Sequence, residues 1–117
     1  MIPRRPCPCR WREYGYGRSV WEGLEEGVAL LSRHPIVSQD RYNFTQKEGD
    51  KDQTFRSALY CKVSIPLVGM VHVFAVHFSY QREQQCRMAA ELRQYAAQQV
   101  PQGGRLVILG FLCTFSP

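Results

Sequence analysis

The stretch from Gln81 to Gln99 constrains the fold of this chain more than any other feature. It is rich in Ala and Leu, and no Gly or Pro interrupts it, which predicts an amphipathic helix. Ser79 is the expected N-cap, and Pro101 with the following glycines is expected to end the helix. The apolar stripe expected along it consists of Cys86, Ala89, Leu92, Tyr95 and Ala96.

Short apolar runs on both sides of this helix predict strands. Residues 56–65 alternate between two faces, which predicts a half-exposed strand. Residues 70–78 are almost wholly apolar, which predicts a central strand covered on both faces and paired with the first as an antiparallel hairpin. Residues 105–110 predict another short buried strand. A helix between apolar strands indicates a layered sheet, so we expect an α/β (α+β) fold of mostly antiparallel strands with a covering helix.

The first half of the chain carries weaker signals. The spaced glycines of residues 13–27 predict turns and loop, residues 28–32 predict a short buried strand, and residues 38–54 predict a polar loop. The expected organisation is a basic, poorly ordered tail at 1–12, a folded domain at 13–110 and a divergent C-terminal tail at 111–117.

The composition fits one compact globular domain, with 44% hydrophobic and 21% charged residues in 117. The net charge is +5, but residues 1–12 hold four arginines and no acid, which leaves 11 basic and 10 acidic residues elsewhere. The positive excess therefore lies in a short tail that can touch phosphates non-specifically, and not in a patch on the folded body. No apolar run approaches the roughly 20 residues that cross a bilayer, and no secretory signal is expected.

The chain has five cysteines, an odd number that excludes a complete disulfide framework within it. Cys7 and Cys9 lack a second ligand pair for zinc. Cys61 and Cys86 lie in apolar settings and are expected to be core residues. We expect thiols rather than disulfides and hence an intracellular location.

Two histidines and one arginine are candidates for chemistry. His72 and His77 differ by five positions along one strand, so their side chains point to opposite faces and cannot share one metal ion. His72 is expected to be a satisfied structural residue, whereas His77 ends a buried strand, where α/β layers place reactive groups. Arg56 opens a strand and can either bind phosphate through its planar fork or serve as a surface residue.

The carboxylate side chains give weaker evidence for a functional site. They fall in two loop groups, expected to be solvated, and none lies in or just after a confidently assigned strand. The residues alone therefore predict no metal site, and no phosphate-loop, dinucleotide-binding or serine-hydrolase motif is present. The two groups are Glu22, Glu25 and Glu26, and Glu48, Asp50 and Asp52.

Three segments, in this order, carry a family resemblance. Residues 26–36 read EGVALLSRHPI, residues 56–59 and 73–79 read RSAL and VFAVHFS, and residues 84–87 and 105–110 read QQCR and RLVILG. They resemble, respectively, the G-V-A-I-L-S-R-x-P-I strand, the R-x-A-L … V-x-N-T-H-L hairpin, and the R-x-x-Q helix with V-I-L-G-D-F-N of the endonuclease/exonuclease/phosphatase (DNase I-like) superfamily. The similarity covers residues 14–110.

The resemblance implies a four-layered α/β sandwich, of which this chain is a part truncated at both ends. It also implies Mg²⁺-dependent hydrolysis of phosphate esters in nucleic acids, inositol phosphates or phospholipids. His77 matches the family histidine that contacts the scissile phosphate and assists proton transfer. Arg56 matches a family arginine near that phosphate.

This sequence also departs from the family pattern. The family's metal-binding glutamate has no match, and after Gly110 the expected D-F-N is replaced by FLCTFSP. The family's C-terminal Asp-His pair lies beyond Pro117. The break after Gly110 indicates a changed reading frame or an alternative exon, which the downstream transcript sequence would test.

The expected function is therefore that of a metal-dependent phosphoesterase fragment that is inactive as this chain, because the Mg²⁺ ligands of the family are missing. The alternative is a non-catalytic binding module or an inert truncated isoform, and an unrelated basic α/β domain is a third reading. Losing half of the sandwich would leave an apolar sheet face uncovered, which predicts poor solubility or a protein partner that covers it.

Overall fold

The computed structural model describes residues 11–18 and 25–112, so Cys7, Cys9 and most of both predicted tails lie outside the described residues. The described part has an α+β fold with one helix and six strands in two sheets. The elements are β1 (Trp11–Arg18), β2 (Glu25–Ser32), β3 (Ile36–Asn43), β4 (Ser57–Ile65), β5 (Gly69–His77), α1 (Arg82–Gln99) and β6 (Arg105–Phe111).

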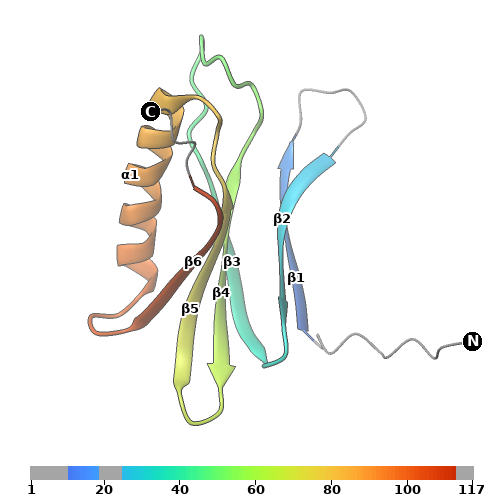
Figure 1. Ribbon diagram of the computed structural model, residues 1–117, viewed down its shortest axis with the longest axis vertical. Coiled ribbons are helices and arrows are strands. Elements are labelled where there is room, and N and C mark those ends of the chain that lie inside the picture. Colours follow the sequence, from blue (N-terminus) through green and yellow to red (C-terminus); the bar gives the residue numbers. More distant parts are fainter. Residues whose placement is uncertain (1–10, 19–24, 113–117) are drawn as a thin grey trace, which may run out of the picture.

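The larger sheet has the strand order β3-β4-β5-β6. The pairs β3–β4 and β4–β5 are antiparallel, whereas β5 and β6 are parallel and are joined by a crossover that contains α1. Strands β1 and β2 form a separate antiparallel pair. Figure 1 shows α1 on one side of the larger sheet and the β1–β2 pair on the other side. The chain therefore builds three layers in the order helix, four-stranded sheet, two-stranded sheet.

The core consists of two clusters, one on each face of β4 and β5. The cluster on the helix side is rich in aromatic rings, such as Tyr60 and Phe74 at 4.9 Å between centroids. The cluster on the other side joins Leu30 of β2 to aliphatic residues of β4 and β5. The buried members on the helix side are Phe44, Ala58, Tyr60, Phe74, Val76, Phe78, Met88, Leu92, Tyr95 and Ala96. Those on the other side are Leu30, Leu59, Cys61, Val63, Val71, Val73 and Ala75.

These clusters confirm the predicted hairpin and correct one part of it. Strand β5 is buried on both faces, as its continuous apolar run predicts. Strand β4 was expected to be half-exposed, and this is wrong for its residues 57–61, which are buried on both faces. The alternation is genuine, but both faces are covered: α1 packs over Ala58 and Tyr60 on the face expected to be exposed, and the β1–β2 pair packs over Leu59 on the other face.

Two segments predicted as loops contain strands. The glycine-rich segment 13–27 includes most of β1, in which Gly15 pairs with Val28 and Gly17 with Glu26. The polar segment 38–54 includes most of β3, whose side chains are largely exposed. Backbone pairing to a neighbouring strand stabilises both strands. A pattern of apolar side chains does not predict strands that are stabilised in this way.

The helix lies where it was predicted and ends as expected, with the Val100 amide bonded to the Ala96 carbonyl at 2.9 Å. Its N-cap residue is Gln81, not Ser79, because the Ser79 hydroxyl accepts the Gln81 amide instead at 3.1 Å. The predicted stripe is correct in the second half of the helix and wrong in the first half. Cys86 and Ala89 are exposed there, so Cys86 is not a core residue. The residues that α1 buries are Gln84, Gln85, Met88, Leu92, Tyr95 and Ala96.

Strand β6 departs most from expectation. It was predicted to be buried, yet all of its residues from Arg105 to Phe111 are exposed. It lies at the edge of the sheet, where β5 is the one described strand that pairs with it. Among the described residues, no helix combines the length and the hydrophobicity that crossing a bilayer requires.

Candidate functional site

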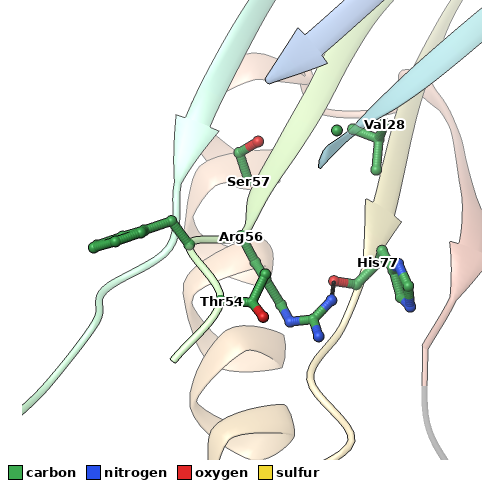
Figure 2. A pocket seen from close by; sticks show the side chains of 7 residues that line it. Val28, Thr54, Arg56, Ser57 and His77 are labelled. Carbon is green, nitrogen blue, oxygen red and sulfur yellow. Dashed lines mark hydrogen bonds between the residues drawn. The ribbon is translucent and has the colours of Figure 1, made fainter. Parts of the chain in front are cut away.

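Arg56 and His77 lie together at one end of the larger sheet. Arg56 directly precedes β4 and His77 is the last residue of β5, and antiparallel pairing brings the start of one strand beside the end of the other. The Arg56 guanidinium donates from Nη1 to the His77 backbone carbonyl at 3.3 Å. Figure 2 shows the Arg56 side chain extending toward the end of β5. The two candidate residues are therefore neighbours, although 21 positions separate them.

A pocket of about 290 Å³, a volume that includes its open mouth, lies at this position (Figure 2). The pocket is small and open to solvent. It is lined by Gly27 and Val28 from β2, by Thr54, Phe55, Arg56 and Ser57 from the approach to β4, and by His77.

Asp52 fixes the orientation of Arg56. The Arg56 Nε atom donates to Asp52 Oδ2 at 2.8 Å, and only 2% of the Asp52 surface is exposed. Burial acts to raise the Asp52 pKa, but hydrogen bonds from Ser79, Arg56 and the Thr54 amide outweigh it and hold the pKa below its ordinary value. Asp52 is thus a buried carboxylate that pairs with the guanidinium and leaves it little rotational freedom.

The backbone of Asp52 also ties this loop to the helix. Its amide donates to the Gln84 side-chain oxygen at 3.0 Å, and its carbonyl accepts from the Gln84 side-chain nitrogen at 3.0 Å. The Gln46 side chain donates to the same carbonyl at 2.9 Å. The expectation that Asp52 is a solvated loop residue is therefore wrong, because the start of α1 packs over the loop and removes the carboxylate from water.

The other predicted loop carboxylates behave differently from each other. Asp50 pairs with Arg87 of α1 at 2.5 Å, and the hydrogen bond from Arg87 holds the Asp50 pKa below its ordinary value. Glu48 is exposed, as expected. The loop is thus attached to α1 by the Asp50 carboxylate and by the Asp52 backbone.

His77 is exposed at the mouth of this region. Its ring lies edge-on to the Phe111 ring of β6, with 5.7 Å between centroids and 77° between planes. Arg56 bonds to the His77 main chain and not to its ring. The imidazole nitrogens of His77 thus make no contact with Arg56, and a role for them in proton transfer stays a prediction.

His72 is a structural residue, as expected from its place in the strand. It is 3% exposed, and its Nδ1 lies 2.7 Å from the hydroxyl of Tyr60. Burial and the nearby Lys62 lower the pKa of His72. It faces the core and shares no group with the pocket at Arg56.

The residues at this site do not fit a Mg²⁺ ion. Magnesium and calcium are held by several oxygen ligands, mainly carboxylates, carbonyls and waters. Within residues 11–18 and 25–112 no group of three or more His, Cys, Asp or Glu side chains could hold a metal. Both oxygens of the adjacent carboxylate, Asp52, already accept hydrogen bonds from protein groups.

The sequence predicted Arg56 and His77 as site residues, which the structure brings together, but it did not predict the burial of Asp52 beside them. One local signal for Asp52 was present. It precedes Thr54 by two positions and Arg56 by four, and Asp side chains often bond the backbone two residues further on. The contact with Gln84, 32 positions away, has no such local signal.

The chain has no match in comparisons with known proteins: no family model, no curated protein and no solved structure matches it.

Proposed function

We propose that this chain is a partial DNase I-like domain of the endonuclease/exonuclease/phosphatase superfamily that binds a phosphate-ester group at Arg56 and His77 without hydrolysing it. One observation carries the proposal. The two residues stand at the two ends of the hairpin segment that resembles the family, 21 positions apart, and both line the same pocket.

The layer order supports the proposed fold. A helix, a four-stranded sheet and a two-stranded sheet follow one another across the molecule (Figure 1). A four-layered sandwich has helix, sheet, sheet and helix in sequence, and the observed order is the one that three of these four layers would give. The proposal takes the β1–β2 pair as the part of a second sheet that this chain contains.

The chemistry of the pocket supports an anion. A guanidinium donates paired N–H groups that match phosphate oxygens. The Asp52 pair orients Arg56 through Nε and the His77 carbonyl engages Nη1, whereas Nη2 has no hydrogen-bond acceptor among the described residues. Asp52 also neutralises part of the positive charge, so we expect weak binding, with a dissociation constant on the order of millimolar.

Hydrolysis is not expected of the described site. Attack on a phosphoryl group builds negative charge, which phosphoesterases of this kind stabilise with a metal ion and with preorganised donors. Arg56 alone, already paired with Asp52, supplies little of that stabilisation. An inert truncated form is the alternative function, and the charge neutralisation of Arg56 by Asp52 is the observation that favours it.

A titration followed by amide NMR shifts tests the binding. Dimethyl phosphate should shift the amides of Thr54, Ser57 and His77, which line the pocket. Arg56→Ala should weaken binding by about tenfold or more, because a charge-assisted donor is lost. Arg56→Lys should bind with intermediate affinity, because it keeps the charge but loses the planar guanidinium that Asp52 and the His77 carbonyl hold in place.

The matched control is Arg93→Ala, which removes an exposed arginine of α1 that does not line the pocket. It should bind like the wild type. Equal affinity of Arg56→Ala and wild type would contradict the proposal. Short oligonucleotides, inositol phosphates and phospholipid vesicles, compared in the same assay, would separate the three possible phosphate-ester classes.

A second assay tests the absence of catalysis. Purified chain with Mg²⁺ and bis(4-nitrophenyl) phosphate should release no nitrophenolate above the buffer rate. Turnover that His77→Ala abolishes would overturn the inactive assignment while leaving the binding site in place.

A further inference from the structure

Strand β6 forms an edge of the larger sheet that carries exposed apolar side chains. Its apolar side chains are between 37% and 46% exposed, and they lie on both faces of the strand. Its inner edge pairs with β5, and no described strand pairs with its outer edge. The apolar side chains are Leu106, Val107, Ile108, Leu109 and Phe111.

The opposite edge of the same sheet shows the contrast. Strand β3 carries Asp40 and Arg41 near its middle, and its pairing register shifts between Ile36 and Ser38. Charges and register irregularities of this kind are the devices by which sheet edges avoid pairing with other chains. Strand β6 has a charge only at its first residue, Arg105, and no Pro. One edge of the sheet is thus protected and the other is open.

The side chains of β6 continue both core clusters outward. Val107 and Leu109 lie in register with Val73 and Ala75, which belong to the cluster beneath the β1–β2 pair. On the opposite face, Ile108 lies in register with Phe74 of the helix-side cluster. A strand added beyond β6 would therefore extend both apolar faces, and it needs apolar side chains on both of its own faces.

We propose that β6 pairs antiparallel with β6 of a second copy of this chain, about a two-fold axis at Ile108. This chain contains the strand that the edge requires, with apolar residues on both faces. A two-fold axis at Ile108 places Val107 opposite Leu109 of the other copy and matches all seven residues of the strand. The only charge, Arg105, lies opposite Phe111 of the other copy, so no like charges meet.

The resulting dimer has a continuous eight-stranded sheet, four strands from each copy. Because the axis runs perpendicular to the sheet, both helices lie on one face and both β1–β2 pairs lie on the other. Most of the net charge of +5 comes from the four arginines of residues 1–12 and not from β6, so added salt should strengthen the dimer rather than dissociate it.

The test is sedimentation equilibrium of the full chain with reductant, at micromolar concentrations. The wild type should show twice the 13.5 kDa chain mass. Val107→Lys and Leu109→Glu should each raise the dimer dissociation constant by about tenfold or more, because each places charges opposite apolar residues at two symmetric positions. Val68→Lys, at an exposed apolar position in the β4–β5 turn, should leave the mass unchanged.

The double variant Val107→Lys with Leu109→Glu tests the register itself. It sets each introduced lysine opposite an introduced glutamate of the other copy, so dimerisation should return. The replaced side chains are exposed in the single chain, and equal thermal unfolding of all variants at monomeric concentration would verify that each one folds.

Three outcomes overturn the proposal. The first is a monomeric wild type in which another part of the chain protects the amides of residues 105–111 from hydrogen exchange. The second is a monomeric wild type in which these amides are unprotected. The third is a double variant that stays monomeric. These results leave the Arg56 site untouched, so failure of the dimer and failure of phosphate binding are separately visible.

Discussion

At the scale of single residues, the buried Asp52 carboxylate stabilises the molecule by pairing with Arg56. Asp52→Asn removes the ion pair and leaves the partly buried Arg56 guanidinium without its counter-charge. We expect the free energy of unfolding to fall by about 2–4 kcal/mol at neutral pH. Glu48→Gln, at an exposed position in the same loop, should change it by less than about 0.5 kcal/mol. Urea unfolding of both variants would measure the difference.

The stability that Asp52 supplies should also depend on pH. The Asp52 pKa is lower in the folded chain than its ordinary value of 3.8, so the unfolded state binds the proton first as the pH falls. The stability that Asp52 supplies is therefore complete above that ordinary value and is lost as the pH falls through the folded-state pKa. The gap between wild type and Asp52→Asn should narrow at acidic pH. A gap that is independent of pH would show that the charge of Asp52 is not the cause.

His72 makes a separate prediction. Burial and Lys62 lower its pKa below the ordinary 6.5, so the unfolded chain takes up a proton before the folded chain does. Stability should therefore be complete above that ordinary value and should fall as the pH is lowered from about 7.5 to 5.5. His72→Gln should flatten the melting temperature over this range, whereas His34→Gln should not. An unchanged slope in His72→Gln would disprove the assignment.

At the scale of elements, the approach of β6 to β5 depends on Gly110. Its φ angle is +123°, and a β-carbon at this position would clash with the carbonyl oxygen of Val76. Gly110→Ala should lower the free energy of unfolding by about 2 kcal/mol or more. Gly103→Ala is the matched control, because Gly103 has φ +79° but open space around it, and about 1 kcal/mol is expected there. Similar losses in both variants would contradict the role of the close approach.

The strands and helix differ in how far the sequence predicts them. The period of two in β4, the apolar run of β5 and the uninterrupted α1 are local patterns, and they predict these elements to within a few residues. Strands β1 and β3 were missed, because glycines and polar side chains conceal strands that backbone pairing maintains. The exposure of β6 was also missed, because an apolar run indicates that a strand can be buried and not that a neighbour covers it.

The residues of the candidate site also differ in how far the sequence predicts them. Arg56 and His77 were identified from segments that resemble a family, and the antiparallel register of β4 and β5 brings them together. Asp52 was expected to be solvated. Its backbone is bonded by Gln84, a buried helix residue that the predicted stripe did not include. Contacts between a loop and a helix far along the chain are decided by packing, which single-sequence patterns do not contain.

At the scale of the whole molecule, the layered arrangement predicts an order of backbone protection. Strand β4 lies between two paired neighbours and under both core clusters, whereas β3 is an edge strand with mostly exposed side chains. Amides of β4 should exchange at least about tenfold more slowly than amides of β3, because they open only with global unfolding. Hydrogen exchange followed by NMR or mass spectrometry would measure both. Equal exchange rates would mean that the sheet opens as one unit.

The connection between β4 and β5 has a consequence for the speed and order of folding. Only Pro66, Leu67 and Val68 separate the two strands, so closing this hairpin costs little chain entropy. Strand β6 reaches β5 only after residues 78–104 have folded into the crossover. We expect Leu59→Ala to slow refolding, and Ile108→Ala mainly to accelerate unfolding, as stopped-flow kinetics would show. The β4–β5 hairpin would then nucleate folding, and β6, the open edge of the sheet, would be the last strand to form.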